Sequence, residues 1–562
     1  TLDWVVIGLF FLALIGIIVW VVKQKQNDSA DYFLGGRDAT WLAIGASIFA
    51  SNIGSEHLIG LAGAGASSGM AMAHWEIQGW MILILGWVFV PFYSRSMVYT
   101  MPEFLERRYN PQSRTILSVI SLISYVLTKV AVTVYAGGLV FQQVFGIKEL
   151  WGIDFFWIAA IGLVVLTALY TIFGGMKSVL YTSVLQTPIL LLGSLIILVL
   201  GFKELGGWDE MMSICSAVTV NEYGDTMTQL IRDNNDPNFP WLGALVGSAI
   251  IGFWYWCTDQ FIVQRVLSGK NEKEARRGTI FGAYLKLLPV FLFLIPGMIA
   301  FALHQKYIGA GGEGFLPLLA NGTANADAAF PTLVAKLLPA GVKGLVVCGI
   351  LAALMSSLAS LFNSSAMLFT IDFYKRFKPE TPEKKLVGIG QIATVVIVIL
   401  GILWIPIMRS VGDVLYTYLQ DVQSVLAPGI AAAFLLGICW KRTSAKGGMW
   451  GLIAGMIIGL TRLGAKVYYS NTAITDSSMF KYLFYDLNWL FFCGWMFLFC
   501  IIVVIAVSLM TEAPSAEKIQ GLVFGTSTPE QKAATRASWN HWDIIHTVII
   551  LAITAAFYWY FW

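Results

Sequence analysis

Long apolar runs separated by short polar stretches form the main pattern along this chain. A bilayer core of ~30 Å requires about 20 apolar residues in a helix, and runs of that length recur throughout the chain. They predict an all-α membrane protein with about fourteen transmembrane helices. The predicted spans are residues 4–23, 41–65, 74–94, 114–145, 153–173, 178–201, 240–265, 279–303, 339–370, 387–408, 412–438, 447–465, 485–509 and 543–561.

Charges in the polar stretches alternate with span number. The stretches after odd-numbered spans are rich in Lys and Arg, whereas those after even-numbered spans are poor in them, and the loop at 202–239 is acidic. Basic loops favour the cytoplasmic side. We therefore expect a multi-pass protein of the plasma (inner) membrane with both termini on the extracytoplasmic side.

Composition agrees with a chain embedded in a lipid bilayer. Hydrophobic residues make up 57% and charged residues only 12%, against about 25% charged residues in soluble domains. There is no dense basic stripe, so no nucleic-acid partner is expected. The six cysteines form no CxxC pair, which argues against a zinc site or a disulfide framework.

The second span, residues 41–64, carries a polar cluster in its middle. The cluster reads SNIGSEH and includes Asn52, Gly54, Glu56 and His57. A charge at mid-membrane depth costs roughly 2.5–3.5 kcal/mol on insertion scales. We therefore expect the helix to unwind here toward a water-filled cavity, as in the binding sites of secondary transporters. The alternative is a continuous helix whose polar groups bond to neighbouring helices.

Spans two to six and seven to eleven form two sets of five. An odd number of spans per set inverts the second set in the membrane, so the first helix of the second set, 240–265, is expected to be broken as well. The predicted parts are a first helix and loop at 1–40, one five-helix repeat at 41–201, an extracellular loop at 202–239, a second repeat at 240–440, and peripheral helices at 441–562 with a cytoplasmic linker at 511–540.

Polar and aromatic residues gather near the two expected breaks. Lys286, in an apolar span, needs a partner, and Glu76 is the candidate. Such a pair, together with a histidine and amides, suits a neutral polyhydroxylated solute, since each hydroxyl taken from water must be bonded again. The alternative is a structural ion pair with interfacial aromatic residues. Asp259 and Arg265 are expected to form a structural or gating pair.

Span nine carries adjacent hydroxyls at Ser356 and Ser357, with Ser360 one turn on. Such hydroxyls often bond back to the carbonyl four residues earlier. The alternative is a Na⁺ site, because two hydroxyls and the unwound carbonyls of the first broken helix would supply hard oxygen ligands beside a half-helix C-terminus.

Seven stretches of the chain resemble the sodium/solute symporter family, specifically its sodium/glucose (galactose) cotransporter branch. They are ASIFASNIGSEHLIGLAGAGA, YTMPEFLERRYN, FGGMKSVLYT, WYWCTDQFIVQRVLSGKN, AYLKLLPVFLFLIPGM, AALMSSLASLFNSSAMLFTIDFYK and LAPGIAAAFLLGICWKR. The resemblance covers spans two to eleven. It implies a LeuT-type core, a 5+5 inverted repeat with peripheral helices, that moves a hexose inward with Na⁺ as the coupling ion.

The resemblance also implies residue roles. The implied sugar site is Asn52, His57, Glu76, Tyr255, Trp256, Lys286 and Gln420. The implied outer gate is Leu61, Trp75 and Tyr416, and the inner gate is Tyr255. The implied Na⁺ ligands are the carbonyl groups of Ala50, Ile53 and Ala353 and the hydroxyls of Ser356 and Ser357.

Two positions depart from the family pattern. Ser183 stands where the family commonly has the Asp of a second cation site, which predicts one Na⁺ per sugar. Gly252 stands where relatives have Asn or Thr near the sugar, so one hydrogen bond is expected to be absent or supplied by water.

The predicted function is Na⁺-coupled hexose uptake, of glucose or galactose, by alternating access. One alternative keeps the fold and carries myo-inositol or another polyol. An alternative of a different class is a sugar sensor or channel without coupled flux. An enzyme is not expected, because nothing supplies a nucleophile arrangement or a metal cluster.

Overall fold

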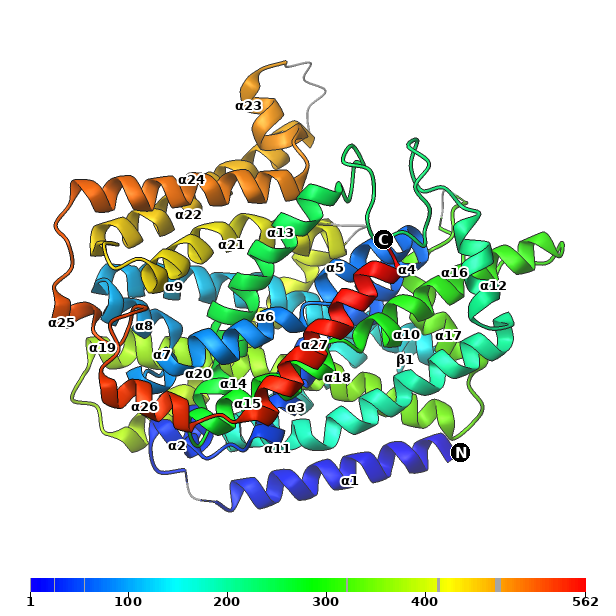
Figure 1. Cartoon of the computed structure of the whole chain (residues 1–562). Helices are drawn as coiled ribbons and strands as arrows, with labels where there is room; N and C mark the ends of the chain where they lie inside the picture. Colours follow the sequence, from blue (N-terminus) through cyan, green and yellow to red (C-terminus); the bar gives the residue numbers. More distant parts are fainter. Residues whose placement is uncertain (1, 25, 55, 320–321, 412–414, 471–476) are drawn as a thin grey trace.

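The computed structural model describes residues 2–24, 26–54, 56–319, 322–411, 415–470 and 477–562, without the side chains of residues 127, 128, 139, 143, 407–411, 415–421, 467 and 470. The regular secondary structure of the described chain is helical apart from one antiparallel hairpin of strands β1 (Glu149–Leu150) and β2 (Ile153–Asp154) and a few isolated bridges. Figure 1 shows α1 along one side of the bundle, α21, α22 and α24 together at another, and α27 crossing in front of α6 and α15, which it contacts.

The N-terminal half of the chain contains many short helical segments joined end to end. Its elements are α1 (Leu2–Val22), α2 (Ser29–Leu34), η1 (Gly35–Arg37), α3 (Trp41–Asn52), η2 (Glu56–Leu61), α4 (Ala62–Ser68), η3 (Gly69–Met72), α5 (Ala73–Glu76), α6 (Gly79–Ile84), η4 (Leu85–Phe89), α7 (Val90–Ser96), α8 (Met101–Arg108), α9 (Pro111–Ser124), η5 (Tyr125–Val130), α10 (Ala131–Phe145), α11 (Phe155–Leu205) and α12 (Trp208–Ser216).

The C-terminal half continues in the same way. Its elements are α13 (Trp241–Phe253), η6 (Trp254–Thr258), α14 (Gln260–Leu267), α15 (Glu272–Lys286), η7 (Val290–Leu294), α16 (Ile295–Gly309), η8 (Ala326–Ala328), α17 (Ala329–Leu337), α18 (Val342–Met367), η9 (Leu368–Tyr374), α19 (Lys375–Phe377), α20 (Glu383–Val411), α21 (Leu415–Cys439), α22 (Ala445–Ser470), α23 (Met479–Lys481), η10 (Tyr482–Asp486), α24 (Trp489–Met510), α25 (Ala516–Ile519), α26 (Pro529–Ala537) and α27 (His541–Tyr560).

Each predicted span overlaps one or more of these helices, and residues 412–414 of predicted span eleven lie outside the described residues. Eleven helical runs of the described chain are long and apolar enough to cross a membrane, and two shorter apolar helices, Trp41–Asn52 and Ala131–Gln142, belong to predicted spans two and four. Helix α11 covers both predicted spans 153–173 and 178–201, which a non-helical Gly175 (φ 54, ψ −149) divides. The prediction of an all-α membrane protein is confirmed.

Both expected helix breaks are present. Helix α3 ends at Asn52, Ile53 is extended (φ −78, ψ 112), and helical structure resumes at Glu56. The second break lies at Asp259 (φ −76, ψ 128), between η6 and α14, and therefore follows the aromatic cluster of this span. Each break frees backbone carbonyl and N–H groups that a continuous helix would pair.

Glycines allow α4 and α16 to approach closely. A Cβ at Gly65 would lie 2.2 Å from the carbonyl oxygen of Leu294, and a Cβ at Gly297 would lie 2.0 Å from that of Ala62. Small residues permit such backbone contact between membrane helices. Helix α4, which follows the break in predicted span two, is therefore packed directly against predicted span eight.

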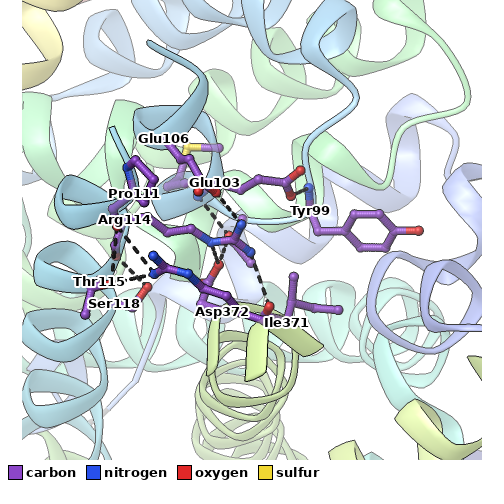
Figure 2. Close-up of polar contacts among 12 residues, drawn as sticks. Tyr99, Glu103, Glu106, Pro111, Arg114, Thr115, Ser118, Ile371 and Asp372 are labelled. Atoms are coloured by element: carbon purple, nitrogen blue, oxygen red, sulfur yellow. Dashed lines mark hydrogen bonds and ion pairs between the residues drawn. The ribbon is translucent and has the colours of Figure 1, made fainter. Parts of the chain in front are cut away.

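A polar network ties the end of predicted span nine to α8 and α9 (Figure 2). Asp372, on η9, accepts hydrogen bonds from Arg114 Nε at 2.7 Å and from Thr100 Oγ1 at 2.9 Å. Arg114 also pairs with Glu106 at 2.5 Å. These residues belong to basic loop regions that the charge pattern assigns to the cytoplasmic side, so the network anchors span nine at that end.

Candidate functional site

A small cavity lies where the two broken spans meet α5, α15 and α21. It has a volume of about 50 Å³, which is less than the roughly 300–1,000 Å³ of typical ligand pockets. A solute of sugar size therefore enters only if the surrounding helices or side chains move apart. The lining residues are Asn52, Glu56, His57, Trp75, Glu76, Gln78, Ile251, Gly252, Tyr255, Trp256, Lys286 and Gln423.

Glu76 is the centre of the polar wall. Its Oε2 accepts a hydrogen bond from Lys286 Nζ at 2.6 Å and lies 3.2 Å from His57 Nε2. Asn52 Nδ2 lies 3.4 Å from the same histidine nitrogen. The ammonium of Lys286 also lies 5.3 Å from the ring centre of Trp256. These contacts confirm the predicted Glu76–Lys286 pair, and among the described residues no hydrogen bond is made to the second carboxylate oxygen.

Aromatic side chains form the other wall. Tyr255 and Trp256 meet edge to face, with ring centres 4.9 Å apart. Trp75 stacks on Trp489 at 5.5 Å and contacts Phe239 edge to face. Flat apolar faces beside hydrogen-bonding groups suit a solute that has both hydroxyl groups and C–H surfaces.

The cavity brings together most residues of the predicted sugar site. Asn52, His57, Glu76, Tyr255, Trp256 and Lys286 all line it. The predicted gate residue Trp75 also lines it, whereas Leu61 is buried on η2 away from the lining. The side chains of Gln420 and Tyr416 lie outside the described part of the chain.

Four lining residues were not predicted to face the solute: Glu56, Gln78, Ile251 and Gln423. Glu56 and Gln423 were within reach of sequence reasoning, because both are polar residues in predicted spans. Gln78 was harder to find, because in a continuous helix it would point away from Glu76. Ile251 gives no sequence signal that separates it from an ordinary core residue.

The serines of α18 lie against the break in α3. Ser356 and Ser357 are buried, and a Cβ at Gly54 would lie 3.1 Å from Ser357 Oγ. Ser51 Oγ and Ser360 Oγ are 2.6 Å apart and join the same two helices. The hydroxyls and the unwound segment predicted to hold Na⁺ are therefore neighbours.

Back-bonding accounts for only one of these serines. Ser360 Oγ donates to the carbonyl oxygen of Ser356 at 2.8 Å. Within the described residues, neither Ser356 nor Ser357 makes such a bond. Among the same residues, the hydrogen-bond partner of Ser356 Oγ is Ser183 Oγ, at 3.4 Å. The carbonyls of Ala50 and Ile53 belong to the C-terminal end of α3, where partial negative charge favours a cation.

A second buried ion pair lies beside this region. Lys129 Nζ, on η5, donates to Asp259 Oδ2 at 2.7 Å, and Tyr125 Oη bonds the other carboxylate oxygen. Four aromatic rings surround the ammonium at 4.9–5.3 Å. Asp259 forms its direct ion pair with Lys129 and not with Arg265, because no described residue hydrogen-bonds the guanidinium nitrogens of Arg265. Lys129 instead links span four to the second break.

Comparison with known proteins agrees with this geometry. The family model described as "Sodium:solute symporter family" matches residues 32–455. The chain is 37% identical over 538 residues to "Sodium/myo-inositol cotransporter 2" of Homo sapiens, covering 93% of this chain and 79% of the relative. It is also 37% identical over 529 residues to "Sodium/glucose cotransporter 1" of Ovis aries, covering 91% of this chain and 79% of that relative.

A solved structure of a Na⁺-coupled sialic acid symporter, in a substrate-bound outward-open state, has the same fold. The TM-score is 0.72 at 22% identity, over 92% of this chain and 99% of the other. The fold and the extended sequence similarity identify a multi-pass Na⁺-coupled solute transporter. The chain belongs to the sodium:solute symporter family, in its sodium/glucose cotransporter branch.

Proposed function

We propose that this symporter carries a neutral hexose, glucose or galactose, inward with one Na⁺ per sugar, in the plasma membrane and with both termini outside. The observation that carries the substrate class is the polar wall at Glu76. Its carboxylate, with Lys286 and His57 beside it, offers acceptors and donors at one place. Glu76 and Lys286 neutralise each other at this wall, which favours a neutral solute there.

Myo-inositol is the second candidate substrate. It presents a ring of hydroxyl groups, which the same wall and aromatic faces accommodate, and the relatives named for myo-inositol match as well as those named for glucose. A cyclic polyol differs from a hexose in lacking the ring oxygen. The substrate is therefore decided by which ring positions find partners in the cavity.

The proposed Na⁺ ligands are the carbonyl oxygens of Ala50, Ile53 and Ala353 and the hydroxyls of Ser356 and Ser357. Support comes from the position of the two serines beside the break and from the absence of back-bonding at both within the described chain. Na⁺ at this place would fix the unwound segment that also carries Asn52 and His57. Ion binding would then order the sugar site without direct contact between the ligands.

The transport cycle follows from this coupling. Na⁺ binding favours the outward-open state. Sugar binding then moves Trp75 and the outer side of the protein over the cavity, and movement of Tyr255 releases both ligands inward. One charge that enters down 100 mV supplies about 2.3 kcal/mol, to which the Na⁺ gradient adds.

The test is initial-rate uptake into proteoliposomes. Labelled glucose, galactose and myo-inositol are compared under inward gradients of Na⁺, Li⁺ or K⁺. We expect Na⁺-dependent uptake of a hexose; uptake of myo-inositol alone would favour the second candidate. Na⁺-independent equilibration of labelled sugar, without accumulation and without counterflow, would contradict symport and support a channel.

A further inference from the structure

Gln78 lies at a break in the third predicted span. Helix α5 ends at Glu76 and α6 begins at Gly79, and between them Ile77 (φ −82, ψ 26) and Gln78 (φ −87, ψ 25) leave the helical conformation. In a continuous helix, residues two apart point to different faces. The break instead places Glu76 and Gln78 together on the wall of the cavity.

The Gln78 carboxamide occupies the space beside Gly252 of α13. Its Nε2 donates to the carbonyl oxygen of Ser248 at 2.8 Å, which fixes the orientation of the amide. A Cβ at position 252 would lie 2.5 Å from Gln78 Oε1 and 2.9 Å from its Cδ, closer than real Cβ atoms come. The two positions therefore compete for one volume, and a side chain at 252 would displace the carboxamide.

The remaining polar atom of this amide is Gln78 Oε1. Gln78 is 2% exposed, and among the described residues nothing donates to Oε1. An amide oxygen that lines a cavity and has no protein donor can accept a hydrogen bond from a molecule in that cavity. This oxygen belongs to the cavity wall, on which Glu76 and Lys286 also lie.

We propose that Gln78 Oε1 accepts a hydrogen bond from one hydroxyl of the transported solute, and that Gly252 is required to make room for it. The inference rests on the proposed function, a neutral polyhydroxylated substrate. Gln78 then supplies the hydrogen bond that a glycine at position 252 cannot make. Gln78 and Gly252 together determine which ring position of the solute must carry a hydroxyl.

The experiment pairs Gln78→Met, which keeps side-chain length and removes the acceptor, with solute analogues that each lack one hydroxyl. Competition against Na⁺-driven uptake gives the affinity of each analogue for both proteins. For one analogue, we expect the unaltered protein to bind about 3- to 10-fold more weakly than it binds the full substrate, the range of a single hydrogen bond. Gln78→Met should lose that discrimination and keep it for the other analogues.

Two further variants separate recognition from folding. Gly252→Ala should displace the carboxamide and give the same analogue signature as Gln78→Met. In Gln78→Ala/Gly252→Thr, the threonine hydroxyl enters the vacated volume and should restore part of the discrimination. Gln142→Met, whose amide bonds Asp154 at 3.0 Å outside the cavity, is the matched control and should leave discrimination unchanged.

Equal discrimination by Gln78→Met and the unaltered protein at every hydroxyl would overturn the inference, even if Na⁺-driven uptake is intact. Failure of the unaltered protein to carry any hexose or polyol with Na⁺ would instead overturn the proposed function. The two failures are thus distinguishable in one data set.

Discussion

Breaking the Glu76–Lys286 pair is the perturbation whose size follows most directly from the structure. The two charged atoms are 2.6 Å apart, and both side chains are more than nine-tenths buried. At an effective dielectric of about 20, Coulomb's law gives an attraction of about 6 kcal/mol. The cost of taking both charges out of water offsets part of this attraction. Removal of one partner from a buried pair typically destabilises the folded protein by about 3–5 kcal/mol.

We predict that Lys286→Met lowers the free energy of unfolding by about 3 kcal/mol, the lower end of that range, because His57, 3.2 Å from Glu76, remains a hydrogen-bond partner of the carboxylate. Glu76→Gln should cost a similar amount by leaving a buried ammonium. The double variant should lose less stability than the two single variants together, by roughly 0.5–3 kcal/mol, the usual range for coupled neighbours.

The assay is unfolding of the purified protein by titration with SDS in Na⁺-containing detergent, for both single variants and the double variant. Lys375→Met is the matched control, because its pair with Glu383 is 3.1 Å long but about one-third to one-half exposed, and such pairs contribute about 0–1 kcal/mol. Two outcomes would refute the idea that a buried charge pair organises this wall. One is a double variant whose loss of stability equals the sum of the two single losses; the other is a loss in Lys286→Met no larger than in Lys375→Met.

Further predictions concern the packing and the anchoring of the core. Lys129→Met should abolish uptake, because it leaves Asp259 without the ammonium of its ion pair. In the same SDS titration, Lys129→Met/Asp259→Asn should be more stable than Lys129→Met alone; equal stability of the two variants would argue against a functional pair. Gly297→Val should reduce the yield of folded protein on size-exclusion chromatography, because the facing helix leaves no space for a Cβ; a normal yield would contradict the close contact. Arg114→Met should destabilise more than Arg114→Lys in a thermal unfolding assay, since Asp372 is buried; equal effects would show that only packing matters there.

The polar cluster at 51–57 was sufficient to predict the first helix break, because charged and amide groups at mid-membrane depth need a cavity or partners. The second break was predicted only approximately. The prediction gave only the range 240–265, whereas the helix continues through the aromatic cluster and ends at Asp259, whose side chain caps α14. Capping chemistry, rather than glycine content, determines where this span breaks.

The residues that sequence reasoning missed depend on geometry that periodicity does not carry. Gln78 reaches the cavity because the helix is interrupted between Glu76 and Gly79. Lys129 is a single charge in a long apolar run, and its partner Asp259 lies 130 positions away. A pairing of Asp259 with Arg265 was expected because both lie near the end of predicted span seven, yet the fold joins Asp259 directly to Lys129.

The central claim is that the break in the second span, together with the hydroxyls of α18, holds the coupling Na⁺. The most direct measurement is Na⁺-titrated initial uptake of the transported solute by Ser357→Ala in proteoliposomes. Ser118→Ala, which removes a hydroxyl that bonds back to the carbonyl of Arg114 at 2.8 Å on α9, is the control. We predict that Ser357→Ala abolishes Na⁺ stimulation while Ser118→Ala retains it. Full Na⁺-stimulated uptake by Ser357→Ala, with an unchanged Na⁺ concentration for half-maximal rate, would contradict the proposed ion site.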